Sequence, residues 1–182
     1  MHTASLDFDL PDSGAMDALG AGLARAFPAA WAATVAGAAE GARQGAVVHL
    51  RGELGSGKTT CARSLLHTLG VLGQVRSPTY TLVDTYSVGQ LNCAHVDLYR
   101  VVSSTEVEEL GLRDLTGPGY LMLIEWPEKG GAAVPPADLD LQLTYAGEAR
   151  VASLRAVSGV GERWLAKLGL DTSLVPYVSN LT

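Results

Sequence analysis

The chain has 182 residues, of which 47% are hydrophobic, 6% aromatic and 18% charged, and its formal net charge is −6. This balance excludes a disordered chain and predicts one domain with an aliphatic, Ala-rich core. The 13 Lys and Arg residues are scattered without a cluster, which argues against a basic nucleic-acid-binding face and favours a protein partner in any RNA pathway.

The N-terminal part of the chain is predicted to form a strand and then one or two helices. Residues 5–10 alternate polar and apolar side chains, as a short strand does. Asp12 and Ser13 are candidate N-caps for a helix with apolar residues at helical spacing. Pro28 is expected to end this helix or to begin the next one. The Ala-rich residues 29–43 are expected to form a second helix or a helical extension.

A buried strand is predicted over 47–50, followed by a glycine-rich loop. The next helix begins at about Lys58, and Gly70 is well placed to end it. Two further strands, 81–86 and 93–99, are predicted to form a hairpin.

The second half of the chain continues the alternation of helices and strands. A Ser103/Glu106 capping box opens a short helix, and the apolar run 120–124 is typical of a central buried strand. Strands over 139–145 and 149–157 and a helix over 162–168 follow in turn, whereas the tail after Gly169 has no clear pattern. These elements predict a single-domain α/β fold with a mixed parallel and antiparallel central sheet flanked by helices.

The segment Gly52-Glu-Leu-Gly-Ser-Gly-Lys-Thr59 matches the phosphate-loop pattern G-x-x-x-x-G-K-[ST] without mismatch, between a strand and a helix. Glycines permit the backbone torsions that aim main-chain amides at a polyphosphate. Lys58 is predicted to reach the β- and γ-phosphates and Thr59 to bind Mg²⁺. The predicted ATP-binding residues are Gly52, Gly55, Ser56, Gly57, Lys58, Thr59, Thr60 and Thr79.

Two carboxylates are candidates to complete the site. Glu125 lies at the carboxyl end of a buried strand, where open α/β sheets bind ligands, so it is predicted to hold Mg²⁺ together with Thr59. The alternative is a Glu that faces solvent. Asp97 shares a strand face with His95, which indicates either a site wall or an exposed hairpin face. Lys58, Asp97 and Glu125 are the candidate catalytic residues.

Several other residues have weaker signals. Residues 77–79 form a short Pro-stiffened segment in which Thr79 could sense a γ-phosphate, although an ordinary loop has the same pattern. Arg100 is a phosphate contact, a partner contact or part of a surface salt bridge. His49 is expected to be a satisfied core residue, and Trp164 to pack the last helix onto the sheet.

The segments GELGSGKTT (52–60), SPTYTLV (77–83), HVDLYR (95–100) and EWPE (125–128) resemble, in this order, the TsaE family of bacterial ATPases. The resemblance spans about residues 6–168. It implies ATP hydrolysis that supports a TsaD–TsaB complex in making threonylcarbamoyladenosine in tRNA, with tRNA contacted only indirectly. It also implies that Asp97 is a catalytic or switch carboxylate and that 77–79 is a switch-like loop.

The chain departs from the family pattern in residues 28–44, an Ala-rich insertion before the phosphate-loop strand. The expected organisation is therefore one ATPase domain over 1–182, with this insertion and with a C-terminal helix and tail over 158–182. How adenine is read is left open, with Asp12, Ser13 and the loop after Trp126 as candidate wall elements.

Three other functions are compatible with a phosphate loop. A small-molecule kinase would need an Arg-rich lid, but Arg113 is the only Arg between residues 101 and 135. A GTPase would carry an Asn-Lys-x-Asp element, which the sequence lacks. A nucleotide-dependent scaffold with little intrinsic hydrolysis remains an alternative.

Cys61 and Cys93 lack metal-ligand spacing and are expected to be reduced core thiols. Without a signal peptide or a long apolar run in the sequence, the expected location is the cytoplasm, with no membrane partner.

Overall fold

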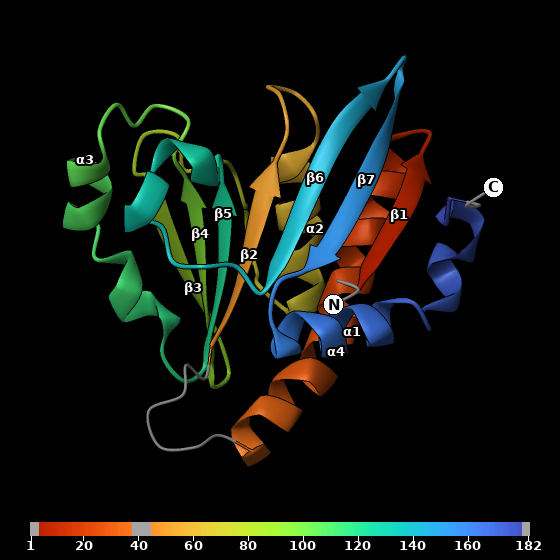
Figure 1. The fold of residues 1–182 in the computed structure, drawn as a ribbon, viewed down its shortest axis with the longest axis horizontal. Coiled ribbons are helices and arrows are strands. Elements are labelled where there is room, and N and C mark those ends of the chain that lie inside the picture. The colour runs from red at the N-terminus through yellow and green to blue at the C-terminus, as the bar shows by residue number, and fades with distance from the viewer. Residues whose placement is uncertain (1–3, 38–44, 180–182) are drawn as a thin grey trace.

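The computed structural model describes residues 4–37 and 45–179. Within those residues, seven strands form one sheet in the order β1-β7-β6-β2-β5-β4-β3 (Figure 1). The strands are β1 Ser5–Leu10, β2 Ala46–Arg51, β3 Val83–Val88, β4 Leu91–Asp97, β5 Tyr120–Glu125, β6 Leu139–Ala146 and β7 Ala149–Ala156. The α-helices are α1 Ser13–Gly37, α2 Lys58–Leu69, α3 Ser104–Glu109 and α4 Gly159–Leu168. Short 3₁₀ helices are η1 Leu112–Thr116, η2 Pro127–Lys129, η3 Gly131–Ala133 and η4 Thr172–Tyr177.

The sheet is mixed, which confirms the predicted fold class. Strand β2 pairs in parallel with β5 and β6, and β4 pairs in parallel with β5. The pairs β3–β4, β6–β7 and β1–β7 are antiparallel. Because β2, β4 and β5 run in the same direction, their carboxyl ends meet at one edge, and the phosphate loop starts there.

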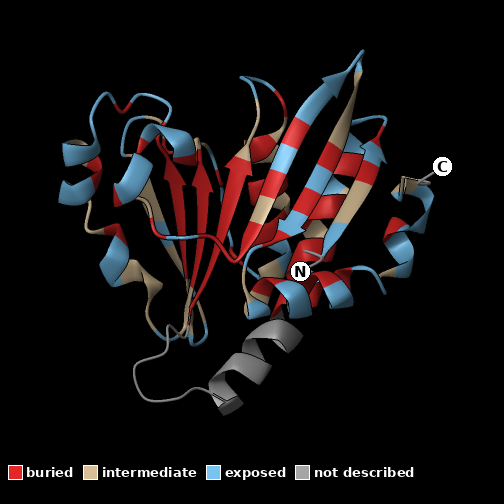
Figure 2. Cartoon of the chain, viewed as in Figure 1, coloured by how far each residue is buried: buried red, intermediate tan, exposed pale blue. Residues whose placement is uncertain are grey.

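Burial differs between the two halves of the sheet (Figure 2). Strands β2, β4 and β5 are buried along almost their whole length, whereas β1, β6 and β7 alternate buried with exposed residues. One apolar cluster joins α1, α2 and α4 to the sheet. A second lies on the other face, where Val107 and Leu112 pack with Met122 and Ile124. The parallel centre is therefore enclosed on both faces, and this fixes the strand ends that form the site.

Helix α1 corrects one expectation from the sequence. Pro28 neither ends nor begins a helix, because α1 runs from Ser13 to Gly37 as the expected extension. A proline fixes φ near its helical value and removes one hydrogen bond, which a long helix can tolerate. Residues 38–44 of the predicted insertion lie outside the described residues.

The predicted β3–β4 hairpin is confirmed, but its strands are displaced by two residues. Leu82 adopts a left-handed conformation (φ 62°), so β3 begins only at Val83. At the other end the strands continue until Gly89 and Gln90 form the turn, with Gly89 at φ 60°.

The predicted C-terminal helix is confirmed as α4, and the tail after it adds η4, which the sequence pattern did not indicate. Helix α4 begins at Gly159 because the Ser158 hydroxyl accepts the Val160 and Gly161 amides at 3.2 Å each. Trp164 packs α4 onto α1, since its Nε1 donates to Leu23 O at 2.9 Å. Across the described ranges we find no helix with both the length and the apolar character needed to span a membrane.

Candidate nucleotide-binding site

The phosphate loop joins β2 to α2 through glycines in left-handed conformations. Gly52, Gly55 and Gly57 have φ values of 136°, 76° and 108°. A Cβ on Gly52 would lie 2.4 Å from Leu143 O, so this position excludes any side chain. The loop therefore presents its backbone at the N-terminus of α2, where amides and the helix dipole favour an anion.

Lys58 is the buried cation of the loop. Its side chain is 4% exposed, and its Nζ donates to Gly52 O at 2.7 Å and to Glu53 O at 2.8 Å. Burial lowers the pKa of Lys58, while the charges of Glu125 and Asp97 act in the opposite direction. The ammonium is bound by carbonyl oxygens, and within the described residues no carboxylate makes a direct ion pair with it.

Glu125, at the end of β5, is 2% exposed, so the solvent-facing alternative is wrong. Its Oε2 accepts the Thr59 hydroxyl at 2.9 Å. Its Oε1 lies 2.9 Å from His95 Nε2. The carboxylate thus links α2 to β4. The two predicted magnesium ligands, Thr59 and Glu125, are therefore in direct contact.

Asp97 ends the neighbouring strand β4, directly opposite Glu125 in the parallel register. It is 4% exposed, which excludes the exposed-hairpin alternative. Its Oδ2 accepts hydrogen bonds from the hydroxyls of Ser77 and Thr79, and its Oδ1 accepts the Tyr99 amide at 2.9 Å. The segment 77–79 is therefore held by hydrogen bonds to a buried carboxylate in the site.

One cavity of about 440 Å³ collects most of the predicted residues. It is lined by Gly55, Gly57, Lys58, Thr59, Thr60, Thr79, Asp97, Glu125, Arg100 and Trp126, among others. Gly52 and Ser56 do not line it. Arg100 stacks on the Tyr80 ring at 4.4 Å, and no carboxylate in the described parts of the chain lies within ion-pair distance of it.

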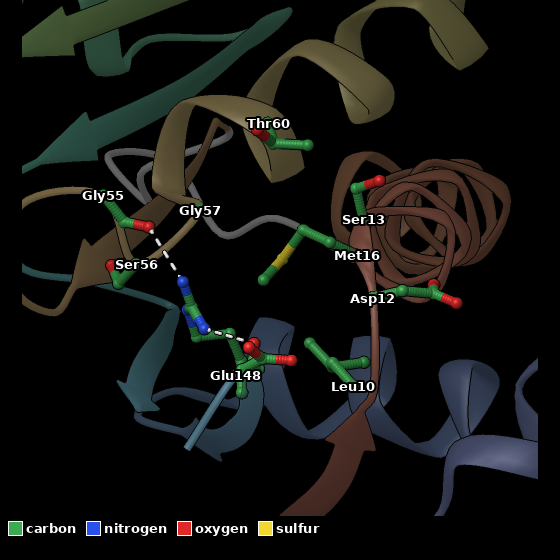
Figure 3. Close-up of a pocket in the computed structure, with 10 residues that line it drawn as sticks. Leu10, Asp12, Ser13, Met16, Gly55, Ser56, Gly57, Thr60 and Glu148 are labelled. Atoms are coloured by element: carbon green, nitrogen blue, oxygen red, sulfur yellow. Dashed lines mark hydrogen bonds between the residues drawn. The ribbon is translucent and has the colours of Figure 1, made fainter. Parts of the chain in front are cut away.

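A second cavity, of about 180 Å³, lies beside the same loop (Figure 3). Asp12, Ser13 and Met16 line it from the start of α1; the Met16 side chain extends into the space toward the phosphate loop, whereas the Asp12 carboxylate points away from it. Asp12 caps α1, because its Oδ1 accepts the Ala15 amide at 2.8 Å. Two of the three candidate wall elements for adenine are thus brought to the loop, whereas the segment after Trp126 is absent from this cavity's lining.

A family model described as "Threonylcarbamoyl adenosine biosynthesis protein TsaE" matches residues 18–152, which include all of these strand ends and the phosphate loop. The chain belongs to the TsaE family.

Two relatives that carry this family name, and one solved structure, are similar to the chain. The chain is similar to "tRNA threonylcarbamoyladenosine biosynthesis protein TsaE" from Haemophilus influenzae, with 41% identity over 116 residues, 64% of this chain and 73% of that protein. The protein of the same name from Synechocystis is 34% identical over 133 residues, 71% of this chain and 74% of that protein. The crystal structure of YdiB from Bacillus subtilis superposes with a TM-score of 0.71 at 25% identity, covering 93% of this chain and 97% of YdiB.

The β6–β7 hairpin adds residues to the candidate site that sequence reasoning missed. Tyr145 donates its hydroxyl to Leu54 O at 2.8 Å. Arg150 lies 3.4 Å from Gly55 O and stacks over the Tyr145 ring at 3.9 Å. Glu148 and Arg150 also line the second cavity. The sequence signal was limited to the turn at Gly147, and only the sheet order brings this turn to the phosphate loop.

The remaining singled-out residues lie outside the cavities. His49 is buried with Nε2 2.9 Å from Pro135 O, which confirms it as a satisfied core residue. Cys61 and Cys93 are free and buried, and burial raises the pKa of Cys61 to about 12 and that of Cys93 to about 11. Both are therefore unreactive structural thiols.

Proposed function

We propose that this chain is a magnesium-dependent ATP-binding and ATP-hydrolysing protein that supports threonylcarbamoyladenosine modification of tRNA by acting on a TsaD–TsaB complex. The observation that carries the proposal is the shared cavity, in which a phosphate loop, a buried ammonium and two buried carboxylates meet. Membership of the TsaE family supports the pathway.

The triphosphate would bind along the phosphate loop. Its charge suits the amides at the start of α2 and the Lys58 ammonium, whose present partners are loop carbonyls. Because Gly52 and Gly57 hold backbone torsions that side chains resist, the loop is already shaped for this ligand.

Thr59 and Glu125 fit a magnesium ion, which prefers oxygen ligands and shares its coordination with nucleotide phosphates and water. When bound, Mg²⁺ would neutralise charge that develops on the phosphate oxygens. Among the described residues, no group of three or more His, Cys, Asp and Glu residues is placed to hold a metal, so the proposed site depends on the nucleotide for its other oxygens.

Asp97 is the proposed group that orients the attacking water. Its carboxylate lines the cavity, and its contacts with Ser77 and Thr79 show that it accepts hydrogen bonds there. In hydrolysis, the water oxygen bonds to the γ-phosphorus as the bond to the β–γ bridging oxygen breaks, which yields ADP and phosphate. Lys58 would stabilise the negative charge on the transferred group, and Arg100 is a second cation lining the same cavity.

The second cavity is the proposed adenosine end of the site. It adjoins the phosphate loop at Gly55, Ser56 and Thr60, so a nucleotide could pass from one cavity to the other along the loop. Arg150 lines it and can stack on a base through its planar guanidinium.

A scaffold with slow intrinsic turnover is the second candidate function. Lys58 is bonded to its own loop and Asp97 to the hydroxyls of 77–79, so both groups are engaged within the chain. A partner that rearranges these contacts would be needed for rapid hydrolysis. A kinase is less well supported, because the segment that would form the lid is packed onto the sheet through Val107 and Leu112.

The test is phosphate release with purified TsaD-like and TsaB-like proteins, each added alone and together. We expect slow release by the chain alone and a marked increase with both partners. Binding of ATP with no release under any condition would favour the scaffold. No nucleotide binding at all would refute the proposal. The proposal includes a cytoplasmic location, where tRNA is modified, and only indirect contact with tRNA.

A further inference from the structure

His95 is a fully buried histidine with one used and one unused ring nitrogen. Its exposed fraction is 0%. Nε2 lies 2.9 Å from Glu125 Oε1, whereas Nδ1 is buried without a hydrogen-bond partner among the described residues. Buried polar atoms are usually satisfied, so an unpaired one calls for an explanation.

The direction of the hydrogen bond follows from the chemistry of the two groups. A carboxylate oxygen accepts a hydrogen bond from an imidazole N–H, so we assign Nε2 as the donor in this contact. A leucine at this position would fill the space without burying an unpaired atom, so packing alone does not account for a histidine.

The two oxygens of Glu125 have different partners. Oε1 is bound to His95, behind the cavity, and Oε2 is bound to Thr59, which lines it. Without the bond to His95, the carboxylate could rotate and exchange its two oxygens. With it, Oε2 is held toward the hydroxyl that the proposed function assigns to magnesium.

We propose that His95 is a positioning residue that fixes the Glu125 carboxylate for magnesium binding. This inference rests on the proposed function, since it assigns a role to a residue behind the proposed magnesium ligands. Groups that orient a metal ligand typically contribute about 10- to 100-fold to metal affinity.

His49 provides a matched comparison in the adjacent part of the sheet. It is also a buried histidine on a central strand, β2, but both of its ring nitrogens have contacts, with Pro135 O at 2.9 Å and with Arg51 Nη2 at 3.4 Å. Among the described residues, it forms no hydrogen bond with Glu125. Replacing His49 therefore tests the cost of losing a buried histidine without disturbing the proposed magnesium ligands.

The experiment compares the wild type with His95→Gln, His95→Leu and the control His49→Leu. Calorimetry gives the affinity for the non-hydrolysable analogue AMP-PNP in saturating Mg²⁺ and in EDTA. The ratio of the first affinity to the second measures the magnesium coupling. We expect this ratio to be at least about tenfold lower in His95→Leu than in the wild type, while the affinity in EDTA is unchanged. His95→Gln, which keeps a donor, should retain most of the ratio, and His49→Leu should retain all of it.

An unchanged ratio in His95→Leu would overturn the inference. A wild type without any magnesium coupling would instead refute the proposed function. If His95→Leu does not fold, His95→Asn replaces it, because its shorter amide cannot reach Glu125. A ¹⁵N-histidine NMR spectrum of the wild type is a second measurement: a proton on Nε2 of His95 supports the inference, and an unprotonated Nε2 overturns it.

Discussion

The ammonium of Lys58 lies 3.9 Å from the centre of the Trp126 ring. Trp126 adopts a left-handed conformation (φ 58°) directly after β5, and its ring also lies 5.0 Å from the ring of Tyr99. The phosphate-loop lysine is thus held between its own loop carbonyls and an aromatic face. To bind a phosphate, it must exchange these contacts for charged oxygens, which are stronger acceptors.

Lys58→Ala should weaken ATP binding by about 10- to 100-fold, because charge-assisted hydrogen bonds contribute about 1.5–3 kcal/mol. Calorimetry at saturating Mg²⁺ measures the loss. Lys129→Ala, in the exposed part of η2, is the control and should bind ATP as the wild type does. Equal affinities of Lys58→Ala and the wild type would contradict the assignment of the phosphate site.

Glu125→Ala should reduce magnesium-dependent ATP hydrolysis by about a hundredfold and ADP binding much less, since the carboxylate acts on the metal side of the phosphates. Steady-state phosphate release and ADP titration separate the two effects. Glu128→Ala is a suitable control, because Glu128 makes an exposed ion pair with Arg51 at 3.1 Å. Equal losses of hydrolysis and ADP binding would indicate a purely structural role for Glu125.

Gly20→Ala should destabilise the fold by about 1–3 kcal/mol through overpacking. A Cβ at this position would lie 2.5 Å from Cys61 O, so α1 could not approach α2 as closely. In Gly159→Ala, the nearest atom is the flexible Arg163 Nη1 at 3.6 Å, and this variant should be neutral or slightly stabilised. Urea unfolding of both variants distinguishes close helix packing from a general effect of replacing helical glycines.

His49 should make stability depend on pH. Burial lowers the pKa of His49 below its usual 6.5, so at mildly acidic pH the unfolded chain binds a proton that the folded chain does not. The stabilising contribution is therefore present above about pH 6.5 and is lost as the pH falls, with a slope of at most about 1.4 kcal/mol per pH unit.

The measurement for this prediction is urea unfolding of the wild type and His49→Leu between pH 7.5 and about 5. The difference in unfolding free energy between the two proteins should shrink as the pH falls. A constant difference would show that His49 has the same pKa in both states.

Local sequence patterns were sufficient for the phosphate loop and for the two carboxylates. Gly52, Lys58 and Thr59 lie in one short motif, and the structure places this motif between a buried strand and a helix, as its flanking pattern predicts. Glu125 could be anticipated because it ends an apolar run, and parallel pairing then brings it opposite Asp97. The positions of these residues could be predicted because each depends on one element and on the shared direction of the strands.

The parts that were missed depend on contacts between distant segments. Arg150 and Tyr145 reach the phosphate loop only because β6 lies beside β2, which no local pattern reveals. His95 was seen on the same face as Asp97, but its bond to Glu125 requires the pairing of β4 with β5. Pro28 was misread because a local rule for proline was applied to a helix that continues beyond it.

The pairing of β1 with β7 has a consequence for how the protein is made. Ser5 lies opposite Arg155 and Leu10 opposite Arg150. The first strand to be synthesised, β1, therefore cannot pair until the last strand, β7, has been synthesised. Such distant pairing slows folding. Asp12 and Ser13 directly follow β1 and line the second cavity, so this cavity is completed only when the sheet closes at that edge. A newly made chain would therefore complete the proposed adenosine end of its site only at the final stage of folding.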